Sequence, residues 1–347
     1  MKNNFDMMKV KFVILTFAVL ASLTSCKNHR KVTRTDTPTS GIAEIAVDES
    51  FAPIIDQQIG VFESLYEKAS IIPIYTNDLN VYDLLLKDSI RLILGTRELT
   101  EYEKLKVEEK KQRLRSLKIA VDGVALIVHK ENSDSLLTTS QIHDIVTGKV
   151  ESWSDINKDS SLGEIVTIFD TPNSSTVRFL RDSICHKEPM GRNVKAISSD
   201  LEAVDLEKVS SNLKVIEYVA SHPNAIGVLG VSWLDNSMSE NDFKLTNDVA
   251  VVGVSRREVA TVSNSYKPLQ YHMALEVAHR YSPLENLESG YPLTRDIYII
   301  TTDAIGGLPT GFYNFIASDK GQRIILKSGL LPANRPIRLL NVSESFD

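Results

Sequence analysis

The sequence predicts an α/β fold with mostly parallel strands, and three observations support this prediction. Short runs rich in β-branched residues alternate with longer runs that carry apolar side chains at helical spacing. Several helical runs begin with a hydroxyl residue that is followed three positions later by Glu or Gln. The chain has 347 residues, which is more than one hydrophobic core usually supports, so we expect two lobes.

Seven runs are predicted to form strands, because each is short, apolar and bounded by polar or turn residues. They are Ile42–Val47, Ile71–Tyr75, Arg91–Leu94, Ile119–Val128, Val166–Phe169, Ala225–Leu229 and Ile297–Thr301. Because helical runs separate most of these strands, they are expected to pair largely in parallel.

Four helix starts lie between the predicted strands. Ser50 precedes Ala52-Pro53, and proline is favoured in the first turn of a helix. In the other three, a hydroxyl and a side chain three residues later can satisfy free backbone N–H groups. These capping boxes are Thr100 with Glu103, Thr138 with Gln141, and Ser199 with Glu202.

The N-terminal segment has a basic start, an apolar run over residues 12–23, and small residues before Cys26. It resembles a bacterial lipoprotein signal peptide, because the apolar run is too short to span a bilayer comfortably. The alternative is a buried N-terminal helix. We expect a signal peptide over residues 1–25, acylation of Cys26 as the first mature residue, and a polar tether over residues 26–40.

Composition and motifs exclude several classes of function. The formal net charge is -6, from 45 acidic and 39 basic side chains that are mixed along the chain, so no basic stripe indicates nucleic-acid binding. Cys26 and Cys185 are the only cysteines, and we expect Cys185 to be a half-buried thiol without a disulfide. No motif predicts a cofactor, a metal site or a catalytic triad, so an enzyme is not expected.

Four predicted strands end in polar turns that lead into helices. These turns are Asp48-Glu49-Ser50-Phe51, Tyr75-Thr76-Asn77, Gly95-Thr96-Arg97, and Asp170 to Thr176. Unpaired N–H groups at a helix start favour anions, whereas each turn alone is explained by simple capping. Their recurrence after successive strands favours an oxyanion site.

Several fragments occur in an order that is characteristic of one family. They are Val121–Val128, Leu137–Ile156 with its Thr147-Gly148-Lys149 and Trp153-Ser154-Asp155-Ile156, Asn173–Thr176, Asn224–Gly227, Tyr291–Arg295, and Phe315–Pro332. Together they resemble the periplasmic phosphate-binding proteins that feed ABC importers, and the broader substrate-binding relatives of these proteins. The resemblance covers nearly the whole chain after residue 41.

This resemblance implies a two-lobed periplasmic-binding-protein fold with a ligand cleft between hinge-linked lobes. The first lobe would span residues 41–118 plus 290–347, and the second residues 119–289. The implied function is capture of phosphate or a related oxyanion, as a monomer, for the permease of an ABC importer. The protein would sit in the cell envelope, facing the periplasm or the cell exterior, held to the membrane through its lipid only.

The resemblance also implies ligand contacts. Ser50 and Phe51 match the hydroxyl and aromatic residue of the family's first loop, and Thr76 lies near its second-loop serine. Thr96 lies in the loop that normally contributes a carboxylate, which accepts the ligand's proton and so disfavours sulfate. The turn that carries ligand hydroxyls corresponds to Asn173, Ser174, Ser175 and Thr176.

Three positions depart from the family pattern. Asp170 stands at the place of the family's ligand arginine, Ser175 stands at the place of a glycine, and the Gly95-Thr96 loop has no aspartate. These departures keep open a relative that binds another small ligand or acts as an extracytoplasmic sensor. A lipoprotein hydrolase or an interaction scaffold that reuses the fold is a further alternative.

Two arginines are candidates to replace the missing positive charge, since a guanidinium can contact two oxygens of an oxyanion. Arg97 is assigned to the ligand, although Glu98 and Glu101 favour a solvated ion pair equally. For Arg178, the carboxylate of Asp182 lies at i,i+4, so a surface ion pair is expected.

Overall fold

The computed structural model describes residues 35–199, 210–234, 248–281, 289–304 and 306–333. Residues from Asp36 onward form one compact unit. The predicted signal peptide, Cys26 and most of the predicted tether lie outside the described residues. Glu202, the partner of Ser199 in the third predicted capping box, also lies outside them.

Within the described residues, ten strands pair into one sheet, in the order β2-β1-β3-β11-β4-β8-β6-β7, with β9 and β12 also pairing with β4. β5 and β10 pair separately. The bounds are β1 Gly41–Asp48, β2 Ala69–Thr76, β3 Leu92–Gly95, β4 Arg115–His129, β5 Leu136–Thr138, β6 Val166–Phe169, β7 Val194–Ala196, β8 Ala225–Gly230, β9 Val249–Val251, β10 Gly253–Ser255, β11 Thr294–Thr301 and β12 Leu331–Pro332. All seven predicted strands are confirmed.

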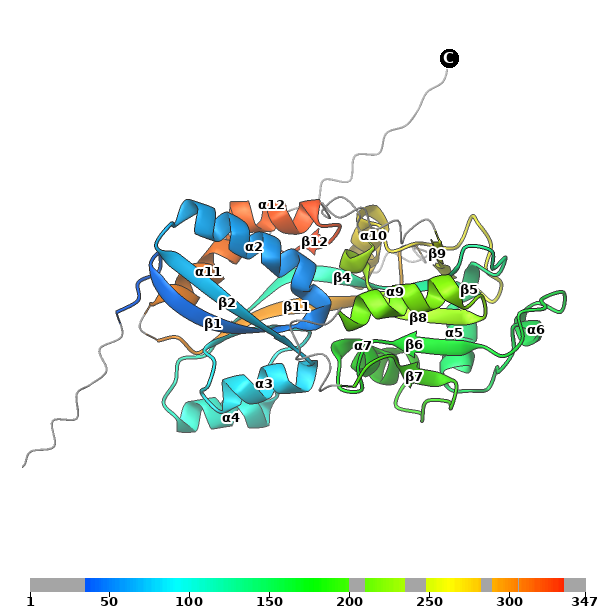
Figure 1. Ribbon diagram of the computed structural model, residues 1–347, viewed down its shortest axis with the longest axis horizontal. Helices are drawn as coiled ribbons and strands as arrows, with labels where there is room; N and C mark the ends of the chain where they lie inside the picture. The colour runs from blue at the N-terminus through cyan, green and yellow to red at the C-terminus, as the bar shows by residue number, and fades with distance from the viewer. Residues whose placement is uncertain (1–34, 200–209, 235–247, 282–288, 305, 334–347) are drawn as a thin grey trace, which may run out of the picture. The chain divides into compact units, whose positions relative to one another are not determined.

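The prediction of mostly parallel pairing is wrong for the middle of the sheet. β11 runs antiparallel to β3 and β4, and β4 runs antiparallel to β8, β9 and β12. The physical reason is the length of β4, which pairs with β11 as far as Gly123 and with β8 from Val124 onward. β4 and β11 therefore pass between two groups of helices (Figure 1), and such crossing strands do not belong to simple βαβ units.

The described residues form ten helices. They are α2 Ala52–Leu65, α3 Asp78–Leu86, α4 Glu101–Glu109, α5 Thr139–Val146, α6 Trp153–Ile156, α7 Ser175–Phe179, α9 Ser211–Ser221, α10 Gln270–Tyr281, α11 Leu308–Ala317 and α12 Asp319–Lys327, with short turns η1 Glu49–Phe51, η2 Leu180–Ile184 and η3 Val231–Trp233. Three of the helices, α2, α4 and α5, begin at or next to a predicted start. The capping boxes at Thr100 and Thr138 are confirmed. Ser50 lies inside η1, and α2 begins at Ala52 without a side-chain cap.

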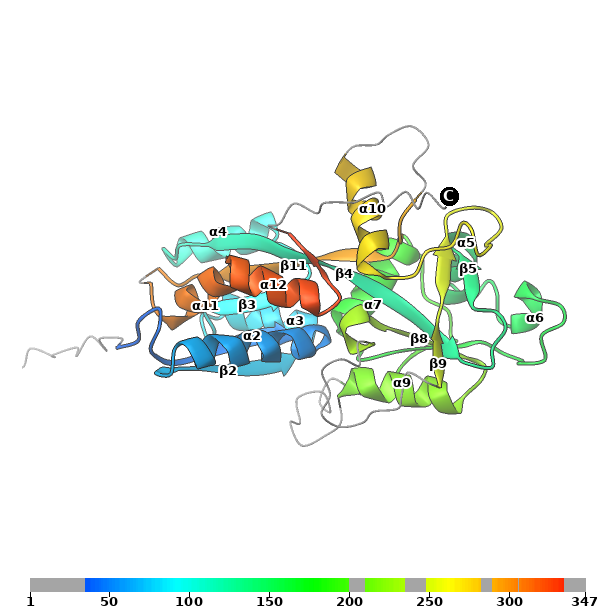
Figure 2. The same cartoon turned by 90° about the horizontal axis from the view of Figure 1, so that it is seen from above.

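We call the part built on β1, β2 and β3 the first lobe and the part built on β6, β7 and β8 the second lobe. In the first lobe, α2, α11 and α12 cover one face of the strands and α3 and α4 the other (Figure 1). In the second lobe, α9 lies on one face and α5, α6 and α7 pack on the other (Figure 2). The predicted lobe boundaries stay a prediction.

Cys185 differs from the prediction in its burial. Its side chain is fully buried in the core of the second lobe, with Leu180 and Ile184 in the same cluster. It is a free thiol. Burial raises the pKa of this thiol, which makes it a packing residue rather than a nucleophile.

The core of the first lobe depends on Phe62 of α2. Its ring is fully buried and makes edge-on contacts with Tyr66, Phe312 and Phe315 at centroid distances of 4.9, 5.3 and 5.3 Å. Phe62→Ala is expected to lower the free energy of unfolding by about 3–5 kcal/mol in urea titrations. Val61→Ala, at a neighbouring position that is 40% exposed, should change it by no more than about 0.5 kcal/mol. Equal effects of the two substitutions would contradict this packing.

Candidate functional site

The polar turns at the ends of β1, β2, β3 and β6 meet beside the two crossing strands. Ser50 of the first lobe and Ser175 of the second lie 3.4 Å apart between their hydroxyl oxygens, and both are buried. The structure therefore brings together two turns that are far apart in the sequence, as the recurrence of hydroxyl residues predicted.

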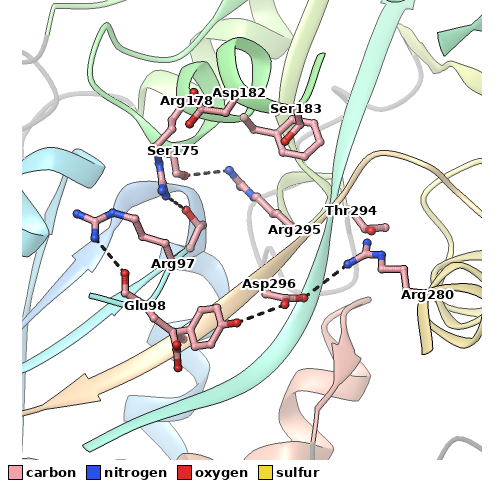
Figure 3. A pocket seen from close by; sticks show the side chains of 13 residues that line it. Arg97, Glu98, Ser175, Arg178, Asp182, Ser183, Arg280, Thr294, Arg295 and Asp296 are labelled. Atoms are coloured by element: carbon pink, nitrogen blue, oxygen red, sulfur yellow. Dashed lines mark hydrogen bonds and ion pairs between the residues drawn. The ribbon is translucent and has the colours of Figure 1, made fainter. Parts of the chain in front are cut away.

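Arg295 of β11 is the buried cation at this meeting point. Its Nη1 donates to the Ser175 hydroxyl at 2.9 Å (Figure 3), and its Nε donates to Asp122 Oδ2 at 2.9 Å. The guanidinium also lies over the ring of Phe51, 5.1 Å from the centroid. Its Nη2 is buried and has no hydrogen-bond partner in the described residues. Arg295 thus contacts one buried hydroxyl and keeps one donor without a partner among the described residues.

Arg178 of α7 is the second cation, and the predicted surface pair with Asp182 is wrong. Its Nη2 lies 3.0 Å from Asp78 Oδ1 and donates to the hydroxyl of Thr96. Arg178 points toward the first lobe because the buried carboxylate of Asp78 is a stronger partner than the exposed Asp182, which pairs with its neighbour Arg181. Arg178 therefore links the second lobe to two turns of the first.

The turn after β6 is organised around Asp170, which is 1% exposed. Its carboxylate accepts hydrogen bonds from the hydroxyls of Ser174 and Thr176. Ser174 also caps α7, accepting from the Val177 N–H at 3.2 Å. Asp170, which stands where the family has an arginine, is thus a buried residue that holds the turn together. Its carboxylate oxygens accept hydrogen bonds from hydroxyls of the same turn.

Carboxylates outnumber cations in this region, and their pKa values reflect it. Burial, reinforced by Asp48 and Glu49, raises the pKa of Asp170 to about 7. Burial and the charge of Asp48 raise the pKa of Asp78 to about 6, against the opposing effect of Arg178. Burial likewise raises the pKa of Glu49. Near neutral pH a fraction of these buried carboxyl groups is therefore still protonated, whereas exposed carboxyl groups would be ionised.

Glu49 and Ser50 connect η1 to the second lobe. Glu49 Oε1 accepts from the Ser210 hydroxyl at 2.6 Å and from the Ser211 N–H at 2.9 Å, at the start of α9. The carbonyl of Ser50 accepts from the indole N–H of Trp233 at 3.0 Å. Two contacts with the second lobe, one from the Glu49 side chain and one from the Ser50 carbonyl, therefore hold η1 in place beside the Ser50 hydroxyl.

The other predicted site residues lie around this centre with their side chains engaged elsewhere. The hydroxyl of Thr76 accepts from Asn80 Nδ2 at 3.2 Å. Arg97 forms an ion pair with Glu103, 2.6 Å from Nη1 to Oε2, rather than with Glu98 or Glu101, and stacks on Tyr82. Asn173 is exposed. Ligand contacts by these three residues stay predictions, as do those by the other predicted site residues.

Sequence reasoning missed the role of Arg295, although the residue lay in a quoted family fragment. The signal was the single aspartate in the apolar run Val121-Asp122-Gly123-Val124, because a carboxylate buried in a strand needs a cation. Arg295 and Asp122 are direct partners in the β4–β11 register. To predict this register from the sequence, one would have to know that β11 lies beside β4 in the sheet.

The part of the chain that the structure describes contains no group of three His, Cys, Asp or Glu side chains placed to hold a metal. Within the same ranges, no helix is both long and apolar enough to cross a membrane.

Fold and site together define a class of binding protein. A family model described as "PBP superfamily domain" matches residues 32–320. The chain therefore belongs to the periplasmic-binding-protein superfamily, and the predicted family is confirmed. This is a superfamily of substrate-binding proteins, so the expectation of a non-enzyme is confirmed at the level of the family.

Individual relatives have names that are more specific. The chain is 28% identical over 158 residues to the "Phosphate-binding protein PstS" of Staphylococcus epidermidis, covering 44% of each chain. It is 24% identical over 232 residues to that of Staphylococcus saprophyticus, covering 66% of this chain and 60% of the relative. The chain thus spans about half the length of the curated relatives it matches.

Solved structures agree on the fold. A putative phosphate ABC transporter substrate-binding protein with bound phosphate from Clostridium perfringens matches 84% of this chain and 99% of its own, with a TM-score of 0.63 and 20% identity. An ABC-type phosphate transport receptor from Vibrio cholerae matches 83% of this chain and 99% of its own, with a TM-score of 0.56 and 18% identity. The predicted two-lobed fold is confirmed.

Asp170 predicts a pH dependence of stability. Its native pKa of about 7 lies above the value of about 3.9 expected in the unfolded chain. Its contribution to stability is therefore complete below about pH 4 and is lost as the pH rises to about 7. The ligand-free protein should lose stability between about pH 4 and 7, and Asp170→Asn should reduce this slope in urea titrations, while the raised pKa values of Asp78 and Glu49 account for the remainder. Asp159→Asn, which removes an exposed carboxylate, should leave the slope unchanged; a slope in Asp170→Asn equal to that of the unmodified protein would contradict the assignment.

Proposed function

We propose that this protein is an extracytoplasmic substrate-binding protein that captures phosphate or a related oxyanion for an ABC importer. The observation that carries the proposal is Arg295, whose buried guanidinium contacts Ser175 and keeps Nη2 unpaired among the described residues. A buried cation that contacts a serine hydroxyl and keeps a spare donor is suited to the oxygens of an anion. Both lobes contribute, so capture couples to closure of the cleft.

The carboxylates around the cations support an oxyanion that carries a proton. Asp48 is 1% exposed, and its Oδ2 has no hydrogen-bond partner in the described part of the chain. An oxygen of this kind can accept a hydrogen bond from an oxyanion that carries a proton, whereas sulfate has no proton to donate. This arrangement favours phosphate and arsenate over sulfate.

The relatives support the same ligand and partner. These relatives are named phosphate-binding proteins and a phosphate transport receptor. For this chain we infer phosphate or a related oxyanion as ligand and an ABC permease as partner, with the protein acting as a monomer. The lobes proposed from the sequence, residues 41–118 with 290–347 and residues 119–289, would close on the ligand.

We also propose that Cys26 carries a lipid that holds the protein in the cell envelope, facing the periplasm or the cell exterior. The support is the lipoprotein-like sequence of residues 1–26. Residues 27–40 would then form the tether between lipid and binding body.

A second candidate is a family relative that binds another small ligand or acts as an extracytoplasmic sensor. The observation that favours it is the buried Asp170 at the place of the family's ligand arginine, with Asp48, Glu49 and Asp78 nearby. An excess of carboxylates suits a neutral or cationic ligand. Stabilisation by phosphate separates the two candidates, since only the first predicts it.

Ser175→Ala tests the anion site. The substitution removes a hydroxyl that contacts Arg295 and leaves the fold of α7 intact, because Ser174 provides the cap. A hydrogen bond to a charged group contributes about 1.5–3 kcal/mol, so the Kd for phosphate in calorimetry should rise by roughly 10-fold or more. Ser154→Ala, at an exposed serine, is the control. Unchanged phosphate affinity in Ser175→Ala would place the anion elsewhere.

Cys26→Ser tests the anchor. Without the thiol no lipid can be attached, so the variant should move from the membrane fraction to the soluble fraction of cells that express it. Cys185→Ser controls for loss of a thiol in general and should stay membrane-associated. Membrane association of the Cys26 variant would refute lipid anchoring.

A further inference from the structure

A cavity of about 470 Å³ adjoins the anion site (Figure 3). Its inner end is formed by Thr96, Ser175, Arg178 and Arg295, which are the groups that contact one another in the site. The cavity therefore opens directly onto the proposed position of the oxyanion.

This cavity is present although the two lobes already touch. The hydroxyls of Ser50 and Ser175 are 3.4 Å apart, Glu49 accepts from Ser210 at 2.6 Å, and Arg178 reaches Asp78 at 3.0 Å. Each of these contacts joins the first lobe to the second. The space is therefore a feature of a conformation in which the lobes are in contact, and not the gap of a wide-open cleft.

The cavity is much larger than an inorganic oxyanion requires. A water molecule occupies about 30 Å³ of liquid, and an oxyanion such as phosphate has only five heavy atoms. The volume instead falls within the range of about 300–1,000 Å³ that is typical of sites for small organic molecules. With inorganic phosphate alone at the inner end, most of the space would remain filled with water.

The lining suits a polar organic group. Phe179 and Tyr298 contribute aromatic surface to the lining, and the acidic side chains Glu98, Asp182 and Asp296 line the cavity beside its arginines. The acidic side chains disfavour a second phosphoryl group on the organic part of the ligand, and the arginines disfavour a cationic group there. A neutral, hydroxylated carbon skeleton can hydrogen-bond to both kinds of side chain.

We propose that the ligand is a phosphate monoester, with its phosphoryl group at Ser175 and Arg295 and its hydroxylated organic part in this cavity. The inference rests on the proposed function, because the phosphoryl group takes the place proposed there for the oxyanion. A monoester keeps the charged oxygens that the arginines bind and adds contacts that inorganic phosphate lacks.

The test is calorimetric titration of the full chain with inorganic phosphate, glycerol 3-phosphate and ribose 5-phosphate. At least one ester should bind roughly 10-fold or more tightly than inorganic phosphate. Asp182→Tyr places a large side chain at the cavity, because Asp182 lines it and pairs with its exposed neighbour Arg181 rather than with a residue of the anion site. This variant should lose the advantage of the ester and keep the affinity for inorganic phosphate within about twofold.

Asp159→Tyr makes the same change of charge and volume at an exposed position away from the cavity, and it should behave as the unmodified protein. Inorganic phosphate binding as tightly as both esters would overturn this inference and leave the proposed function standing. An ester advantage that survives Asp182→Tyr would also overturn it. Binding of neither phosphate nor ester would overturn the proposed function together with this inference.

Discussion

The buried ion pair between Arg295 and Asp122 is the interaction on which the site depends. It joins β11 to β4, the strands that cross between the lobes, and both side chains are at most 6% exposed. Removing one partner of a buried pair leaves an uncompensated charge and typically costs about 3–5 kcal/mol. Gly230 leaves room for the pair, because a Cβ there would lie 3.3 Å from both Arg295 Nη2 and Asp122 Oδ2. The pair fixes the direction of the guanidinium and therefore the place where Ser50, Ser175 and the adjoining cavity meet.

Around this pair, the protein keeps polar groups that a core built only for stability would avoid. Arg295 Nη2 and Asp48 Oδ2 are buried without a partner in the described residues, and Asp170 and Asp78 have raised pKa values. Each such group costs free energy in the ligand-free state. A ligand that supplies both an acceptor and a proton donor would recover this cost on binding.

The sequence was sufficient for the features that are set by local interactions. The seven strands and the capping boxes at Thr100 and Thr138 depend on residues within a few positions of one another. The antiparallel pairing of β4 and β11 depends on a strand that returns about 170 residues later, which no local pattern specifies. Arg178 illustrates the same limit, because its nearest candidate in sequence was Asp182 whereas its partner is Asp78, 100 residues away. The order of the family fragments predicted the fold, but it did not predict which arginine lies at the site.

The most direct test of the central claim is a crystal structure of the protein soaked with arsenate, whose arsenic atom is located by its anomalous signal. The account predicts one strong anomalous peak at the lobe interface, with arsenate oxygens within hydrogen-bonding distance of Ser175 Oγ and the Arg295 guanidinium. A peak elsewhere in the molecule, or a site without arsenate under conditions that saturate binding in solution, would contradict the account.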